Sequence, residues 1–153
     1  MKGDKTPTPD DFKFHCEVEV RFRDLDAMGH VNNAVYFSYF EVARTGYMRA
    51  LGHRPPGEIS FADLYPFIML DVYCKYLAPA VLSQKLSVYL RTSRIGTKSY
   101  EFEYLITDLV DGHAIAVGHS TQVHYDYRQE ETLPIPDDFR NRIENLEGRK
   151  LSV

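Results

Sequence analysis

One helical segment, residues 34–51, is too apolar to lie on a protein surface. Its apolar side chains recur at the spacings of three and four residues that one face of a helix produces. This stripe consists of Tyr36, Phe40, Ala43, Tyr47 and Leu51, and it is widened by Val35, Tyr39 and Val42. Glu41 and Arg44 can pair one turn apart, and Gly52 is placed to end the helix. Because such a helix must be covered, the rest of the chain has to supply a surface that wraps around it.

The pattern outside this helix predicts strands. Residues 16–23 alternate between apolar and charged side chains, with Phe22 on the apolar side, and a period of two is typical of a half-buried strand. Further strand candidates follow the helix at residues 67–77, 85–92, 99–107 and 113–127. Asp111-Gly112 is a hairpin turn signal, and residues 94–98 form a longer hairpin connection. Short connections between these strands imply an antiparallel sheet.

The predicted fold class is α+β, an antiparallel sheet wrapped around one long central helix. The order is β-α-β-β-β-β, with a C-terminal helix over residues 137–146. Small side chains on one face of the last long strand suit the close approach of a helix; they are Ala114, Ala116, Gly118 and Ser120. We expect a single domain over residues 1–153, with residues 1–12 as a flexible lead-in. The predicted sheet leaves exposed edge strands, and pairing these edges between two subunits would cover them. We therefore expect a homo-oligomer.

Composition and charge restrict the class of function. The net charge of −4 provides no overall basic field for nucleic acid or an anionic membrane surface. The polar N-terminus has no apolar signal region, and no apolar run approaches the ~18 residues of a transmembrane helix. Cys16 and Cys74 are too few for a disulfide framework, so we expect a cytoplasmic protein. The chain has no Walker loop, no GxGxxG and no GxSxG elbow, which leaves Rossmann and serine-hydrolase functions without support.

A short polar turn, residues 24–33, joins the first strand to the helix. Asp26 lies just upstream of the predicted helix start, and Gly29 allows an unusual backbone angle. Asn32 or Asn33 is a candidate helix cap. Free N–H groups at a helix start polarise a carbonyl oxygen, and a carboxylate acts as a general base on water or attacks directly. The turn therefore suits a polar carbonyl substrate held beside a base or nucleophile.

The turn and the helix together carry a long motif, which reads Asp24-x-Asp26-x-x-Gly29-His30-Val31-Asn32-Asn33-x-x-Tyr36-x-x-Tyr39-x-Glu41-x-Ala43-Arg44. This motif resembles the signature of hotdog-fold acyl-CoA thioesterases, in particular the 4-hydroxybenzoyl-CoA thioesterase-like branch. The resemblance continues at residues 94–99, 118–123 and 135–136, and it covers roughly residues 14–146. It implies a hotdog fold and the hydrolysis of acyl-CoA thioesters to a carboxylic acid and free CoA.

The resemblance also implies roles for single residues. In the family the aspartate of this turn is the catalytic carboxylate, which corresponds to Asp26, and the motif puts the backbone N–H of Asn33 nearest the role of oxyanion donor. His30 either assists Asp26 or the substrate, or is a turn residue whose ring is tied to a backbone carbonyl. Asp24 is expected to be structural. Glu41 is the fallback acid, because some hotdog thioesterases use a helical glutamate.

The same resemblance suggests where the substrate binds. Coenzyme A carries phosphates, and relatives bind its nucleotide and pantetheine near the 94–98 hairpin, across a dimer interface. Arg94 and Lys98 are the candidate ligands there, and Gly96 offers close backbone approach. The acyl pocket is expected along the helix and the facing strands. Its candidates are Tyr36, Tyr39, Phe40 and Tyr73, although core packing explains each of them equally well.

Alternatives to this function remain open from the sequence. The same Asp26 suits an acyl-carrier-protein thioesterase with a different partner surface, and a non-catalytic acyl-CoA binder is the alternative of another class. The resemblance implies no metal or redox cofactor, because CoA is part of the substrate, and a homodimer or homotetramer with the site at the subunit interface. No HExxH motif or close histidine–cysteine pair is present; an Asp24/Asp26/His30 metal site stays open.

Overall fold

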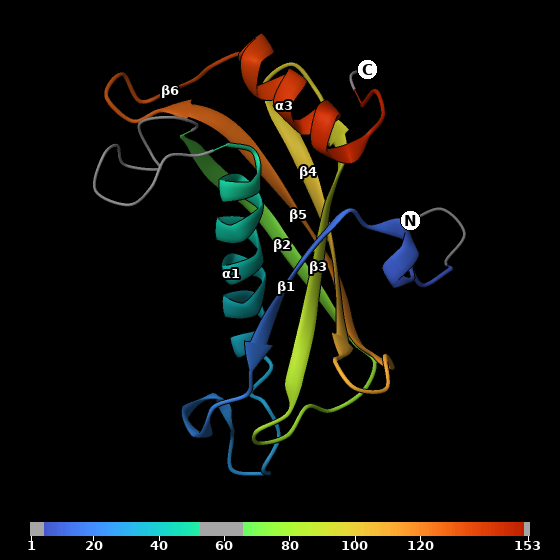
Figure 1. Ribbon diagram of the computed structural model, residues 1–153. Helices are drawn as coiled ribbons and strands as arrows, with labels where there is room; N and C mark the ends of the chain where they lie inside the picture. Colours follow the sequence, from blue (N-terminus) through green and yellow to red (C-terminus); the bar gives the residue numbers. More distant parts are fainter. Residues whose placement is uncertain (1–4, 53–65, 152–153) are drawn as a thin grey trace.

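The computed structural model describes residues 5–52 and 66–151, so the loop predicted at 53–64 lies outside the described residues. The elements in chain order are η1 (Pro9–Asp11), β1 (Phe14–Glu19), η2 (Phe22–Asp24), α1 (Val35–Ala50), β2 (Phe67–Tyr76), β3 (Lys85–Ile95), β4 (Ser99–Asp108), β5 (Ala114–Asp126), β6 (Glu131–Thr132) and α3 (Asp137–Glu147). The long strands form a curled antiparallel sheet in the order β1-β3-β4-β5-β2, and β6 pairs with β5. The sheet curls around α1, and α3 closes one end (Figure 1). The predicted α+β hotdog architecture is confirmed.

The contact between α1 and the sheet depends on small residues of β5. A Cβ atom built on Gly118 would lie 2.6 Å from Cζ of Phe40, which leaves no room for a larger residue. The Phe40 ring stacks on Tyr104 of β4, with ring centroids 4.2 Å apart. The small face predicted for β5 therefore leaves room, at Gly118, for the Phe40 ring of α1.

Helix α3 is attached to the core through a buried carboxylate. Oε1 of Glu147 accepts hydrogen bonds from the Tyr47 hydroxyl at 2.7 Å and from the Thr92 N–H at 3.0 Å. Tyr47 belongs to α1 and Thr92 to β3. One carboxylate thus connects the central helix, the sheet and the C-terminal helix.

The two ends of α1 follow the prediction with one difference. Gly52 has a φ of +92° directly after the helix, as expected for a residue that ends it. At the other end Ala34, not an asparagine, is the N-cap residue, and it makes no side-chain capping bond. The side chain of Asn32 acts from farther out, because its Oδ1 accepts the Ala34 N–H at 2.9 Å.

Three local predictions need correction. The first strand ends at Glu19, and Phe22, expected on its apolar side, is 82% exposed in η2. Within the expected lead-in, η1 is a short 3-10 helix, and Phe12 is buried beside Tyr89.

The predicted pair of Glu41 and Arg44 is the third correction. No bond between these two described residues is present in the structure, and Arg44 instead donates to the Tyr104 hydroxyl at 3.2 Å. Arg44 thus binds a residue of β4, a tertiary contact that helical periodicity does not predict. Among the described residues, no helix is long and apolar enough to cross a bilayer.

Candidate active site at the start of helix α1

Asp24 fixes the turn from within. It is 2% exposed, and its carboxylate accepts the backbone N–H of Arg21 at 2.9 Å, the Arg21 guanidinium at 2.9 Å and the Tyr39 hydroxyl at 2.9 Å. Its backbone oxygen accepts the Asn32 N–H at 2.8 Å. Burial raises the pKa of Asp24, but the bonds from Arg21 and Tyr39 outweigh it and hold the pKa below its ordinary value. Asp24 is therefore a charged anchor whose oxygens are already engaged, in agreement with the structural role expected for it.

Asp26 lies in a tight turn, and only one of its two carboxylate oxygens accepts a hydrogen bond from the described residues. Its N–H donates to the His30 carbonyl at 2.9 Å, and its carbonyl accepts the Gly29 N–H at 3.1 Å. Gly29 adopts a φ of +82°, which suits glycine. Oδ1 of Asp26 accepts the Met28 N–H at 2.9 Å. Within the described part of the chain, Oδ2 has no hydrogen-bond partner, so one carboxylate oxygen of a half-buried aspartate is available for chemistry.

Asp26 and Asn33 line the same open pocket, of about 550 Å³. The other lining residues are Met28, His30, Val31, Tyr36, Tyr76, Leu77, Ala78 and Pro79. The turn and the start of α1 form one wall, and the chain that leaves β2 forms the other. The walls are joined by the hydrogen bond from the Val31 N–H to the Ala80 carbonyl at 2.9 Å. The pocket thus has a carboxylate, a helix start and a largely apolar opposite wall.

The backbone N–H of Asn33 points away from the helix. The Asn32 carbonyl accepts the Val35 N–H at 2.9 Å, so it points into the first turn of α1. In a trans peptide the N–H of the next residue points in the opposite direction, and the described residues contain no cis peptide. No acceptor for the Asn33 N–H lies among the described residues. It is a free donor at the positive end of a helix dipole.

The structure brings together only some of the site residues predicted from the sequence. Asp26, His30, Asn33 and Tyr36 line one pocket. Tyr39 is occupied with Asp24, and Phe40 is fully buried in the core.

Tyr73 lies elsewhere. Its ring stacks on that of His119, with ring centroids 5.0 Å apart. Both residues line a second pocket of about 800 Å³, which has no lining residue in common with the Asp26 pocket. The reason is the strand period of two: Val72 and Cys74 pack against the core, so Tyr73 between them points to the other face. Glu41, the fallback acid, is exposed and does not line the pocket.

Tyr76 lines the pocket but was not among the site residues predicted from the sequence. Its hydroxyl donates to the Asn33 carbonyl at 2.6 Å, and its ring packs edge-on against Tyr36 at 4.9 Å. The available signal was parity, because Tyr76 shares the inward side of β2 with Cys74.

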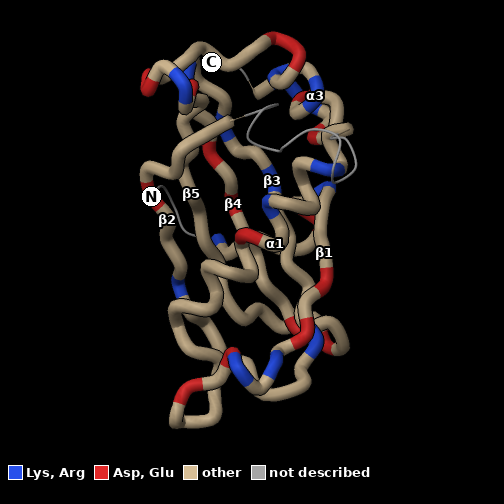
Figure 2. Tube along the Cα trace, turned by 90° about the vertical axis from the view of Figure 1, so that its left-hand side faces the viewer, with Lys and Arg blue, Asp and Glu red and all other residues tan. Residues whose placement is uncertain are grey.

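The proposed CoA ligands lie on the β3–β4 hairpin and are absent from the Asp26 pocket. Nη1 of Arg94 lies 3.6 Å from Oε1 of Glu101, and Nζ of Lys98 donates to the Thr132 hydroxyl at 3.2 Å. The Gly96 carbonyl accepts a bond from Arg140 at 2.9 Å. Basic residues of β3 lie beside acidic residues of β4 (Figure 2). Within one chain, therefore, this hairpin does not face the candidate carboxylate.

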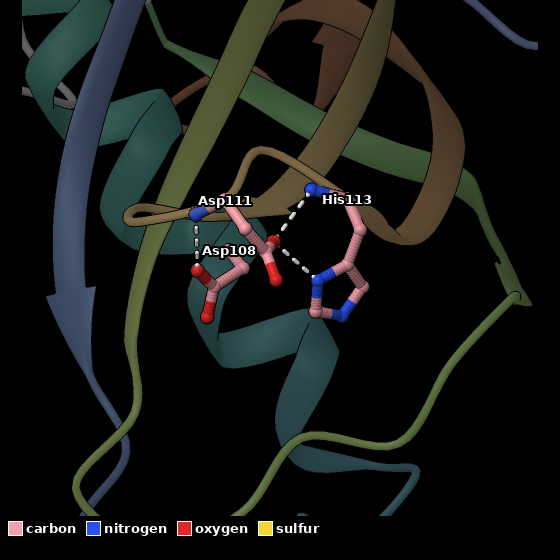
Figure 3. Close-up of side chains that lie close together, drawn as sticks. All are labelled: Asp108, Asp111 and His113. Atoms are coloured by element: carbon pink, nitrogen blue, oxygen red, sulfur yellow. Dashed lines mark hydrogen bonds and ion pairs between the residues drawn. The ribbon is translucent and has the colours of Figure 1, made fainter.

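One group of potential metal ligands occurs among the described residues, at the turn between β4 and β5. Side-chain ligand atoms of Asp108, Asp111 and His113 lie within 4.8 Å of one another (Figure 3). Oδ1 of Asp108 accepts the Asp111 N–H at 2.9 Å, and Oδ1 of Asp111 accepts the His113 N–H at 2.9 Å. These bonds explain the cluster as a hairpin turn, and it does not line the Asp26 pocket.

Comparisons with known proteins identify the family of this chain. A family model described as "Thioesterase-like superfamily" matches residues 20–143. The long-chain acyl-CoA thioesterase FadM of Escherichia coli is 27% identical over 130 residues, which cover 85% of this chain and 96% of FadM. The uncharacterised protein YsmA of Bacillus subtilis is 31% identical over 94 residues, and the match spans only 61% of this chain and 60% of YsmA.

A solved structure is similar over nearly its full length. It is a thioesterase from Thermus thermophilus, complexed with coenzyme A and Zn, and it superposes with a TM-score of 0.80 at 35% identity, covering 93% of this chain and 99% of that one. The fold and the family match over most of the chain agree. The chain belongs to the thioesterase-like superfamily and is a hotdog-fold thioesterase.

Proposed function

We propose that this enzyme hydrolyses acyl-CoA thioesters with Asp26 as the reacting carboxylate and the backbone N–H of Asn33 as the oxyanion donor. The observation that carries the proposal is their position in one pocket at the start of α1. Asp26 keeps Oδ2 free while its Oδ1 is held by the Met28 N–H. A fixed carboxylate with one free oxygen is what either a base or a nucleophile requires.

The reaction balances with these two groups and water. Asp26 takes a proton from water as the water oxygen bonds to the carbonyl carbon, or Oδ2 bonds to that carbon first and water then cleaves the anhydride. In both routes the carbonyl oxygen gains negative charge, which the Asn33 N–H accommodates. In the general-base route the C–S bond then breaks, and the CoA thiolate takes the proton that Asp26 accepted. In the nucleophilic route the C–S bond breaks as the anhydride forms, and the thiolate takes the proton released when water cleaves the anhydride. Loss of one such donor typically costs about 3–4 kcal/mol of transition-state stabilisation.

A second copy of the chain would complete the substrate site. β2 is an edge strand that pairs only with β5 among the described strands, and Leu70 on it is 61% exposed. Long exposed edges are commonly paired, and a two-fold axis would place β2 antiparallel to its copy. The Phe67 end of one β2 would then lie beside the Tyr76 end of the other.

That pairing would bring the predicted CoA ligands of one subunit close to Asp26 of the other. Phe67 pairs with His124, and the His124 N–H donates to the Lys98 carbonyl at 2.8 Å, so the β3–β4 hairpin lies at the Phe67 end. Asp26 lies at the Tyr76 end. In an antiparallel dimer the hairpin of one copy, with Arg94, Gly96 and Lys98, approaches the pocket of the other. The cytoplasm suits such an enzyme, and both cysteines are free.

The test is a hydrolysis assay with variants of one carboxylate. Purified protein is given a panel of acyl-CoA thioesters of different lengths, and free CoA is followed with a thiol reagent. Asp26→Asn keeps the size and the acceptor for the Met28 N–H, and it is expected to lower kcat by about a hundredfold or more. Asp126→Asn is the matched control, because Oδ1 of Asp126 accepts the Arg128 and Gln129 N–H groups in a similar turn at a distance from the pocket.

Each outcome of the assay bears on the assignment. Hydrolysis that survives in Asp26→Asn removes Asp26 from the proposed role. Binding of acyl-CoA without turnover by any form supports the non-catalytic binder instead. Faster turnover of acyl-carrier-protein thioesters than of CoA thioesters would reassign the substrate carrier.

The dimer is tested separately by light scattering. Leu70→Lys places a charge on the β2 edge and is expected to give monomers with little activity. Val110→Lys, at a residue that is 92% exposed in the β4–β5 turn, is the control and should leave the assembly unchanged. A wild type that is monomeric and fully active would contradict the shared site.

A further inference from the structure

Tyr76 is the one side chain of β2, among the described residues, that binds the backbone at the start of α1. Its hydroxyl donates to the Asn33 carbonyl at 2.6 Å, and its ring lies 4.9 Å from that of Tyr36 at an angle of 78°. Both rings line the pocket that contains Asp26. Tyr76 is 43% exposed, so it contributes to the rim of this pocket more than to the core.

The bond matters because Asn33 lies between two peptide planes. The plane before it is held by the Val35 N–H, which donates to the Asn32 carbonyl at 2.9 Å. The plane after it is held at its N–H by Oδ1 of Asn32 and at its carbonyl by Tyr76. Of these three hydrogen bonds, only the one from the Tyr76 hydroxyl comes from a residue outside the turn and the helix. It therefore sets the helix start relative to the opposite wall of the pocket.

We propose that Tyr76 is a positioning residue for the oxyanion donor, and that its hydroxyl keeps the Asn33 backbone in the orientation that the thioester carbonyl requires. The inference rests on the proposed function. Tyr76 acts through the backbone of Asn33, and Asp26 keeps its own hydrogen bonds when Tyr76 is changed.

The hydroxyl is a donor over the whole working range of the enzyme. Burial, and then the neighbouring Cys74 and Tyr36, raise the pKa of Tyr76 to about 12. Tyr76 thus does not titrate near neutrality, and its removal should lower the rate without changing the shape of the pH profile.

Tyr76→Phe tests the inference with an unusually close control. Tyr127 is also exposed, and its hydroxyl also donates to a backbone carbonyl at 2.6 Å, that of Phe67. Tyr127 lines neither pocket. Tyr76→Phe and Tyr127→Phe therefore remove the same kind of bond, once at the helix start and once at the opposite end of β2 in the same chain.

The expected result is a split between kcat and KM. Tyr76→Phe should lower kcat about tenfold, leave KM within about twofold and keep the pH profile, because the lost interaction matters most in the transition state. Tyr127→Phe should match the wild type. The melting midpoints of the two variants should agree, since each loses one hydrogen bond at a partly exposed tyrosine.

Amide exchange supplies a readout that does not depend on turnover. In Tyr76→Phe the amide protons of Ala34 and Val35, which are hydrogen-bonded to Asn32, should exchange with solvent several-fold faster than in the wild type, while Tyr127→Phe leaves them unchanged. Equal exchange in all forms overturns the inference even if no thioester is hydrolysed. Unchanged kcat in Tyr76→Phe, or a kcat loss that follows a lower melting midpoint than that of Tyr127→Phe, also overturns it. A wild type that hydrolyses no thioester refutes the proposed function separately.

Discussion

The hydroxyl of Tyr39 donates to Oδ2 of the buried Asp24 at 2.9 Å, and so ties the polar turn to the second turn of the central helix. Tyr39 and Asp24 are 4% and 2% exposed. Tyr39→Phe leaves the carboxylate short of a donor in a place that water does not reach. We expect a loss of about 1–3 kcal/mol in the free energy of unfolding, measured by urea denaturation. Tyr89→Phe is the control, since its hydroxyl has no partner in the described chain, and an equal loss there would contradict the assignment.

The lowered pKa of Asp24 leads us to expect that the free energy of unfolding decreases at acidic pH. Its pKa is held below the ordinary 3.8, because the bonds from Arg21 and Tyr39 outweigh the effect of burial. A carboxyl with a lowered folded pKa stabilises the protein above its unfolded pKa, and that contribution is lost as the pH falls through the folded pKa. Urea unfolding from pH 7 to pH 2 should show the loss beginning below about pH 4. Asp24→Asn should be less stable at pH 7 and show a shallower decline, and parallel curves for the two proteins would contradict this.

The carboxylate of Glu147 predicts a local effect at the C-terminus. The Tyr47 hydroxyl and the Thr92 N–H both donate to its Oε1, so Glu147→Ala leaves the buried Thr92 N–H without its acceptor and the Tyr47 hydroxyl with only the Thr92 hydroxyl, 2.8 Å away. The expected cost is about 1–3 kcal/mol, and hydrogen exchange should show α3 opening before the sheet. Asn145→Ala on the exposed side of α3 is the control. Uniform exchange across α3 and β3 would show instead that the helix unfolds only with the whole domain.

Gly118 predicts an intolerance of even one methyl group. A Cβ atom there would meet the Tyr73 backbone oxygen of β2 at 2.5 Å and the Phe40 ring at 2.6 Å, which forces the strand, the helix or the ring to move. Gly118→Ala should lower the free energy of unfolding by about 1–3 kcal/mol. Gly112→Ala, where a Cβ atom meets nothing within 4 Å, tests backbone strain alone because Gly112 has a φ of +76°. Wild-type stability in Gly118→Ala would contradict the close approach of both Phe40 and the β2 backbone to Gly118.

Periodicity predicted the architecture well because burial follows it directly. The stripe that includes Phe40 and Tyr47 is buried against strands whose alternating faces were also predictable, as at Tyr104. The exception at Phe22 has a local cause: Asp24 accepts the Arg21 N–H and turns the chain into η2 before the alternation ends. A polar side chain that binds its own backbone competes with strand pairing, and hydrophobic spacing does not record that competition.

The site was only partly predictable for a different reason. Asp26 and Asn33 belong to one contiguous motif, so their shared pocket follows from the turn that connects them. Tyr76 is 43 positions from Asn33 in the chain, and only the packing of β2 against α1 brings them together. Tyr73 shows the converse error, because an aromatic residue on a facing strand was assigned to the pocket without regard to parity. Contacts across elements require the register, which a single sequence does not contain.

The two walls of the Asp26 pocket come from separate stretches of chain, and this has an evolutionary consequence. The proposed reacting groups, Asp26 and Asn33, lie on one short stretch, whereas Leu77, Ala78 and Pro79 on the other carry none of them. Substitutions in the second stretch can reshape the cavity while the first stays intact. Selection can therefore diversify which acyl group is accepted without rebuilding the chemistry that cleaves it, and a library confined to residues 77–79 is the natural starting point for redirecting the enzyme.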